Sequence, residues 1–127
     1  MINAMTKNNE YDQNIINALK SLPSPLRTFD GHIVKFDLDK RYETIYEHIA
    51  NKKHRLHISD IKLIPVILKD KSFLKSDKNS KKYRNYIGRR TKKNERLKYL
   101  KIVTIKNKDK TESVITIMLI KKNVDSL

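Results

Sequence analysis

The hydrophobic pattern of this chain changes period near residue 72, and this change limits the folds that it can adopt. Before that point apolar residues recur at helical spacing, and after it come three segments rich in β-branched and aromatic residues. These segments are KYRNYIG, RLKYLKIVTIKN and TESVITIMLIKK. Helices followed by adjacent strands predict an α+β fold, with the helices packed on one face of an antiparallel meander.

The N-terminal part is predicted to begin with a helix and to continue into a short strand. Segment 11–22, YDQNIINALKSL, places apolar residues at helical spacing behind a cap at Asp12. The PSP sequence at 23–25 ends this helix, because proline cannot continue it. The sequence FDGHIVKF then predicts an Asp-Gly turn before a strand.

Two further helices are predicted before the strands. The second begins behind a cap at Asp39, and its buried stripe consists of Tyr42, Ile45, Tyr46, Ile49 and Ala50. The third follows a cap at Ser59 and is short. Proline lacks an N–H and resists a helix interior, so we place Pro65 near the start of this helix or at a kink.

The last two strands are predicted to form a hairpin with a loop at Asn107–Lys110. In that register Lys106 pairs with Thr111, and Lys101 faces Thr116. A slip of one residue would change these partners and the side chains that converge.

Positive charge is concentrated in one segment. The net charge is +15, and residues 71–110 hold 16 of the 29 basic residues but 3 of the 14 acidic ones. A coding bias towards lysine would enrich the whole chain and does not explain this unevenness. Local positive potential attracts polyanions, so nucleic acid is the leading partner, ahead of an anionic membrane surface or an acidic protein.

Several classes of site are disfavoured by composition. The chain has no cysteine, so it has neither disulfides nor a thiolate nucleophile. His54 and His57 are spaced to meet on a helix, but a zinc site needs further ligands that the sequence does not obviously supply. We expect no metal and no cofactor. No apolar run approaches a membrane span, and we expect a cytoplasmic protein that does not bind membranes.

A metal-free phosphodiester site is better supplied with residues. Cleavage of RNA through attack by the ribose 2′-hydroxyl needs a base, an acid and fixed cations next to the phosphate oxygens. Candidates are the helix histidine His48, the Gly-Arg-Arg sequence with Arg89 and Arg90, and Lys101, which interrupts the apolar side of a strand. His48 is equally well explained as a surface or capping residue, and Gly-Arg-Arg as a basic turn that binds phosphate without chemistry.

Residues of the basic segment are predicted to bind RNA. The candidates are Lys82, Arg84, Tyr86, Lys92, Lys93, Arg96, Lys98 and Tyr99. The two tyrosines can stack unpaired bases or pack on the sheet, and spacing alone does not choose between these roles.

Five short motifs, in order, resemble one nuclease superfamily. They are YEHIANKKH, DIKLIPVILKD, YRNYIGRR, KYLKIV and SVITIMLIK. Residues 31–127 resemble the phage-associated branch of the superfamily that groups barnase, EndoU, the tRNA-cleaving colicins and RelE. The resemblance implies helices followed by an antiparallel sheet of about four strands, with a metal-independent ribonuclease site on the sheet. Residues 1–30 lie outside the resemblance and are expected to form an N-terminal helical arm that packs on the sheet edge or meets a partner.

The resemblance also assigns roles to individual residues. His48 would act in proton transfer, with His54 as the alternative residue for this role. Arg89 or Arg90 would bind the phosphate. Lys101 and Thr116 would complete the site on the last strands. No glutamate stands clearly in the sheet as a base.

The expected function is therefore an endoribonuclease, a toxin or effector of a bacterium or its mobile elements. It would leave 2′,3′-cyclic phosphate and 5′-hydroxyl ends on RNA, with tRNA and ribosome-associated RNA as candidate targets and an acidic antitoxin or immunity protein as a candidate partner. The alternative is a non-catalytic RNA- or ribosome-binding module with the same fold.

Overall fold

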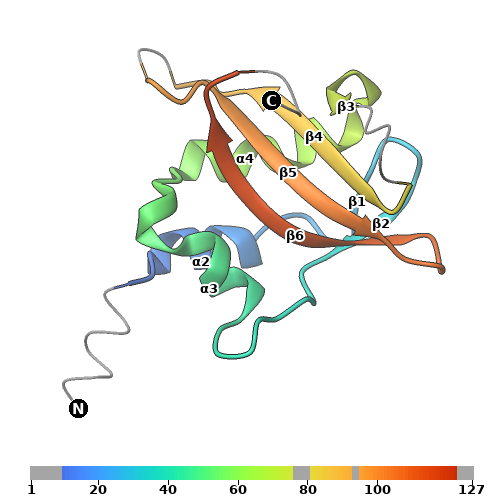
Figure 1. Ribbon diagram of the computed structural model, residues 1–127, viewed down its shortest axis with the longest axis horizontal. Coiled ribbons are helices and arrows are strands. Elements are labelled where there is room, and N and C mark those ends of the chain that lie inside the picture. The colour runs from blue at the N-terminus through green and yellow to red at the C-terminus, as the bar shows by residue number, and fades with distance from the viewer. Residues whose placement is uncertain (1–9, 76–80, 93–94, 123–127) are drawn as a thin grey trace.

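The computed structural model describes residues 10–75, 81–92 and 95–122. Within these residues, three helices lie against one face of a curled six-stranded sheet (Figure 1). The predicted α+β class is confirmed. The meander of about four strands is wrong in detail, because two short strands from the N-terminal part extend the sheet at one edge and a third short strand extends it at the other.

The elements follow one another along the chain with short connections. The helices are α2 (Gln13–Lys20), α3 (Ile45–Ala50) and α4 (Ile58–Lys69), and the 3-10 turns are η1 (Lys52–His54) and η2 (Lys71–Phe73). The strands are β1 (Leu26–Arg27), β2 (Ile33–Lys35), β3 (Leu74–Lys75), β4 (Tyr83–Arg89), β5 (Tyr99–Lys106) and β6 (Thr111–Ile120). The strand order is β1-β2-β6-β5-β4-β3, and every neighbouring pair is antiparallel except β2 and β6.

The N-terminal segment belongs to the main core. Helix α2 begins behind Asp12 as predicted, and the Asp12 side chain accepts a hydrogen bond from the Asn14 N–H. Its apolar residues Ile15 and Leu19 are buried in the same cluster as the sheet residues. The next strand, β1, pairs with β2. From residue 10 onwards, the expected N-terminal arm therefore packs with the sheet: α2 contributes to the core, and β1 is an edge strand.

Helix α3 begins later than the sequence predicts. Thr44 is its cap, and a reciprocal pair of hydrogen bonds joins the Thr44 and Glu47 side chains to each other's backbone N–H. Asp39 still contributes, because its side chain accepts a hydrogen bond from the Ile45 N–H. Tyr42 precedes the helix and is 75% exposed, so its place in the buried stripe is wrong.

Helix α4 spans 12 residues with Pro65 in its interior, so the helix is longer than predicted and Pro65 does not lie near its start. Its N-cap is His57, not Ser59. A proline inside a helix costs about 3 kcal/mol. Four buried side chains of α4 offset this, since each contributes about 1.5–3 kcal/mol. They are Ile61, Ile64, Ile67 and Leu68.

The β5–β6 hairpin has the predicted loop but a different register. The Asn107 N–H donates to the Thr111 carbonyl across the loop. Lys106 pairs with Glu112, and Lys101 pairs with Met118 instead of Thr116. The pairing also shifts between Val103 and Thr104, at a β-bulge. The predicted register is therefore wrong by one residue near the loop and by two beyond the bulge.

The helices decide which face of the sheet is buried. Successive residues of a strand point to opposite faces. Tyr86, Leu100, Ile102 and Ile117 point to one face and are fully buried in the cluster that includes the helices. We call this the helix-covered face and the other the outer face.

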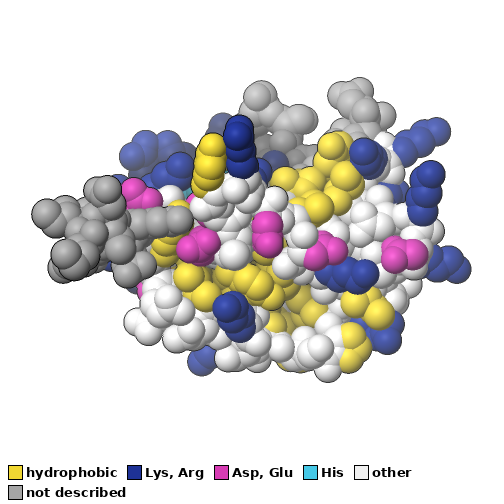
Figure 2. All heavy atoms as spheres, turned by 90° about the horizontal axis from the view of Figure 1, so that it is seen from below, with side chains coloured by type: hydrophobic (Ala, Val, Ile, Leu, Met, Phe, Trp, Pro, Cys, Tyr) yellow, Lys and Arg dark blue, Asp and Glu magenta, His cyan; other side chains and the backbone are white. Residues whose placement is uncertain are grey.

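Charge is unevenly distributed over the molecule. Seen from below in Figure 2, Asp and Glu side chains form a row across the surface, with most Lys and Arg side chains around it. Cations concentrate where β4 connects to β5 and where β6 finishes, at the upper left of Figure 1. We call this region the basic end. No helix in the described part of the chain has the length and apolarity needed to cross a membrane.

Candidate active site

Two histidines that are six residues apart in sequence lie side by side. His48 is in the last turn of α3 and His54 ends η1, and their rings meet edge to face with centroids 5.5 Å apart. The local sequence explains this contact. Helix α3 ends at Ala50, and the Asn51 side chain accepts a hydrogen bond from the Lys53 N–H, which starts the tight turn η1.

Each ring is oriented through its Nδ1 atom. His48 Nδ1 lies 3.2 Å from Glu43 Oε1, and His54 Nδ1 lies 3.1 Å from the carbonyl oxygen of Ile49. A carbonyl only accepts hydrogen bonds, so His54 carries a proton on Nδ1, and its neutral form presents a lone pair on Nε2. In residues 10–75, 81–92 and 95–122, no hydrogen bond engages Nε2 of either ring. Among these residues, both Nε2 atoms are therefore without a hydrogen-bond partner.

The carboxylate beside His48 is itself held in place. Tyr11 Oη donates to Glu43 Oε2 at 3.0 Å. Burial, followed by the hydrogen bond and negative charge of Glu43, raises the pKa of Tyr11 to about 12, so the phenol remains a donor at neutral pH. A carboxylate on Nδ1 fixes the orientation of the ring, as in catalytic triads.

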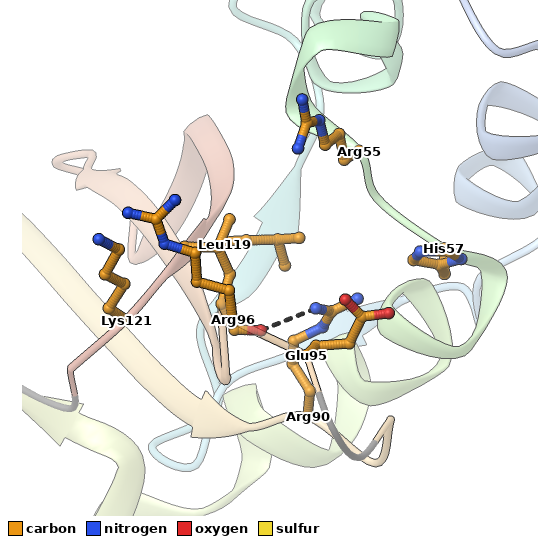
Figure 3. A pocket seen from close by; sticks show the side chains of 8 residues that line it. Arg55, His57, Arg90, Glu95, Arg96, Leu119 and Lys121 are labelled. Carbon is orange, nitrogen blue, oxygen red and sulfur yellow. Dashed lines mark hydrogen bonds between the residues drawn. The ribbon is translucent and has the colours of Figure 1, made fainter.

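A cationic pocket begins one residue after His54. It has a volume of about 330 Å³. It is lined by Arg55, His57, Arg90, Glu95, Arg96, Leu97, Leu119 and Lys121 (Figure 3). Arg55 has a left-handed backbone conformation with φ of 56°, which is costly for a residue other than glycine. Neither His48 nor His54 lines the pocket. Arg55 connects the histidine pair to the pocket, because it follows His54 in sequence and lines the pocket.

Arg90 forms a buried wall of the pocket. Its Nε and Nη2 donate to the two carboxylate oxygens of Asp60 at 2.7 and 2.9 Å, and its Nη1 donates to the Leu97 carbonyl at 2.8 Å, the dashed line in Figure 3. Asp60 is in the first turn of α4 and is fully buried. Arg90 therefore fastens the β4–β5 connection to α4, and its charge is balanced by Asp60.

The remaining side chains leave the pocket positive. Glu95 is paired with Lys92 at 3.3 Å, and Lys92 Nζ lies 3.3 Å from His57 Nε2. Within the described part of the chain, no carboxylate forms an ion pair with Arg55, Arg96 or Lys121. Guanidinium groups suit two oxygens of a phosphate, and lysine adds a point charge. The pocket is therefore suited to a phosphate group.

Four of the predicted site residues lie on the outer face. Arg89, Tyr99, Lys101 and Thr116 alternate with buried neighbours and point away from the helices. Lys101 lies on the same side of β5 as Tyr99 and Val103, as predicted. It pairs with Ile87, which is fully buried, while Leu100 and Ile102 point to the helix-covered face. The histidine pair is on α3 and η1, and the structure does not bring His48 and Lys101 together.

Two predicted RNA-binding residues belong to a buried network. Tyr86 is fully buried and its hydroxyl donates to Glu112 Oε1 at 2.9 Å. Of its two predicted roles, Tyr86 therefore packs in the core, and the prediction that it stacks on RNA bases is wrong. Arg84 Nη1 donates to Glu112 Oε2 at 2.7 Å, and Arg84 also forms two hydrogen bonds with Asp30. Hydrogen bonds from Arg84 hold the pKa of Asp30 well below its usual range.

Sequence reasoning misses the centre of this network. Glu112 is fully buried in β6, and it also accepts hydrogen bonds from Thr104 at 2.7 Å and contacts His32 Nδ1 at 2.8 Å. Glu112 is therefore a glutamate within the sheet, and hydrogen bonds from Arg84, Tyr86 and Thr104 occupy its carboxylate. Alternation in TESV would have placed Glu112 on the same face as Val114, but only the register shows that this face is covered.

The same cluster does not fit a metal ion. Ligand atoms of Asp30, His32 and Glu112 lie within 4.8 Å of one another. The Arg84 guanidinium, however, already contacts both carboxylates at 2.7 Å. A cation would have to displace this charge, so the arrangement is better described as an ion-pair network.

The other predicted contacts are distributed around the basic end and β4. Lys82 and Lys98 are exposed, and Lys92 and Arg96 lie at the pocket. Lys93 lies outside the described residues.

Comparison with protein-family models, with curated proteins and with solved structures finds no match to this chain. The candidate site is therefore judged on its own geometry.

Proposed function

We propose that this protein is a metal-independent endoribonuclease that uses the histidine pair for proton transfer. The observation that carries the proposal is the contact between His48 and His54, with both rings oriented through Nδ1 and both Nε2 atoms available to a ligand. Cleavage of RNA needs two proton-transfer groups, and imidazole works as either acid or base near neutral pH.

The chemistry assigns one role to each ring. One neutral imidazole takes the proton of a ribose 2′-hydroxyl as the 2′-oxygen forms a bond to phosphorus. The other, protonated, imidazole gives a proton to the 5′-oxygen as its bond to phosphorus breaks. The products are a 2′,3′-cyclic phosphate and a 5′-hydroxyl. Because His54 Nδ1 donates to the Ile49 carbonyl, a neutral His54 presents its lone pair on Nε2, which makes His54 the base and leaves His48 as the acid.

In the proposal, the cationic pocket supplies the positive charge that binds the phosphate. Arg55 directly follows His54 in sequence, and it lines the pocket together with Arg96 and Lys121. Fixed cations stabilise the negative charge that develops on the phosphate oxygens in the transition state. An intracellular ribonuclease of this kind would harm its host, so the proposal includes an acidic protein inhibitor.

The test is incubation of the purified protein with total RNA in EDTA, followed by analysis of the fragment ends. We expect cleavage with 5′-hydroxyl and cyclic phosphate ends. His48→Ala and His54→Ala should each lower the rate by about 10²–10⁴. Lys53→Ala changes an exposed side chain in the same turn as His54 and is the matched control. Intact RNA at high protein concentration would overturn the proposal.

A non-catalytic RNA-binding module is the second candidate. It is favoured by the position of Arg89 and Lys101, which lie across the sheet from the histidine pair. It predicts salt-sensitive binding without cleavage. For about five phosphate contacts on single-stranded RNA, log affinity should fall against log salt with a slope of roughly −3.5.

A further inference from the structure

An arginine and a tyrosine form a pair on the outer face at the basic end. Arg89 on β4 and Tyr99 on β5 are directly opposite each other in the sheet. Arg89 Nη1 donates to Tyr99 Oη at 3.3 Å, and Arg89 Cζ lies 5.7 Å from the centre of the ring. Arg89 is exposed and Tyr99 is half-buried. The sheet therefore presents an aromatic ring and a guanidinium group together at its surface.

This pair and the cationic pocket are the two sides of one edge of the molecule. Arg89 and Arg90 are consecutive, and Arg89 points to the outer face while Arg90 lines the pocket. Additional cations surround this edge. They are Arg55, Lys92, Arg96, Lys98, Lys121 and Lys122. In the described parts of 89–99 and 119–122 the one acidic residue is Glu95, which is paired with Lys92.

We propose that the Arg89–Tyr99 pair is a stacking subsite for a nucleobase of single-stranded RNA whose backbone also occupies the cationic pocket. This inference deepens the proposed function and rests on it. A tyrosine stacks on any unpaired base, and such a contact contributes to affinity without sequence selection. The surrounding cations bind the backbone phosphates of the RNA where it crosses the end of the sheet.

The aromatic ring distinguishes nucleic acid from other anions. An acidic peptide would be attracted by the same charges but has no base to place on Tyr99. In a duplex the bases are stacked on each other and their faces are not accessible, so the subsite selects single strands. The substrate class is therefore single-stranded RNA, or a loop or end of a folded RNA.

The test measures binding rather than cleavage, so it is separate from the test of the nuclease. Fluorescence anisotropy with a labelled 2′-deoxy oligonucleotide, which cannot be cleaved through its 2′-hydroxyl, gives the dissociation constant. Tyr99→Ala should weaken binding by about 5- to 100-fold. Tyr99→Phe keeps the ring and should stay within about twofold of the wild type. A duplex of the same sequence should bind more weakly than the single strand.

A second exposed arginine–tyrosine pair provides the matched control. Arg41 Cζ lies 5.1 Å from the ring of Tyr42, which precedes α3, away from the basic end. Tyr42→Ala should leave binding unchanged. The subsite is refuted if Tyr99→Ala binds like the wild type, or if a poly-glutamate peptide competes as well as the oligonucleotide. If the protein cleaves RNA but Tyr99→Ala does not weaken oligonucleotide binding, the subsite alone is refuted. If Tyr99→Ala weakens binding but the protein does not cleave RNA, only the nuclease is refuted.

Discussion

Glu43 Oε1 lies 3.2 Å from Nδ1 of His48, while the other oxygen of the same carboxylate accepts the hydrogen bond of Tyr11. This links a residue before α2 to a side chain in the last turn of α3. The contact orients His48 towards the space beside His54, so the geometry of the candidate site depends on three segments that are distant in sequence.

Replacing the carboxylate should slow cleavage without weakening binding. Glu43→Gln keeps the shape of the side chain but replaces the carboxylate that orients the His48 ring, and we expect kcat to fall about 10- to 100-fold. The affinity for a 2′-deoxy oligonucleotide should stay the same, because Glu43 does not line the pocket. Tyr11→Phe should have a smaller effect on kcat. A parallel loss of affinity in Glu43→Gln would show that the substitution disturbs the fold instead.

Breaking the ion pair between Asp60 and Arg90 should destabilise the protein. Both side chains are almost completely buried, so Asp60→Ala leaves an unpaired buried guanidinium and should cost about 3–5 kcal/mol of unfolding free energy. Chemical denaturation measures this loss. The double variant Asp60→Leu, Arg90→Met should recover much of it, because neither charge is then buried alone. A double variant as unstable as Asp60→Ala would contradict this account.

Gly88 allows α4 to pack directly on β4. A Cβ atom at this position would lie 2.6 Å from Ile67 Cγ1 and 2.7 Å from Ile67 Cδ1. Ile67 is buried and has little room to move, so Gly88→Ala should cost about 1–3 kcal/mol. In an Ile67→Ala background the same substitution should cost less, and thermal unfolding of the four proteins measures the difference. Equal costs in both backgrounds would exclude the clash.

Stability at acidic pH should depend on Asp30. Its pKa is lower in the folded state than the value of about 3.9 expected when unfolded, so its contribution is present above about pH 4 and is lost as the pH falls through the folded pKa. The unfolding free energy of Asp30→Asn should therefore fall less steeply than that of the wild type below about pH 4. Asp37→Asn, at an exposed carboxylate, is the control and should follow the wild type.

Local patterns in the sequence were sufficient for several elements. The Asp12 cap, the apolar spacing of α2 and the strand segments β4, β5 and β6 were all predicted, because each depends on residues a few positions apart. The loop at Asn107–Lys110 was predicted for the same reason. The length of α4 was underestimated, because burial of α4 in the core outweighs the local preference of proline.

The composition of the candidate site was accessible from sequence only in part. His48 and His54 were singled out as alternatives, and their contact depends on the turn at Asn51 that returns the chain towards α3. The buried Glu112 and the roles of Arg84 and Tyr86 were missed. Strand alternation reveals two faces, but the packing of helices decides which of them is buried.

The sequence by itself therefore determined the α+β class, the positions of most elements and the concentration of positive charge, because these follow from spacing and composition. Tertiary structure alone decided that the sheet separates Lys101 from the histidine pair. It also decided that Arg89 points to the outer face while Arg90 lines the pocket. The physical reason is that strand register, the bulge in the β5–β6 pairing and the side chosen by the helices are fixed by contacts between residues far apart in the chain.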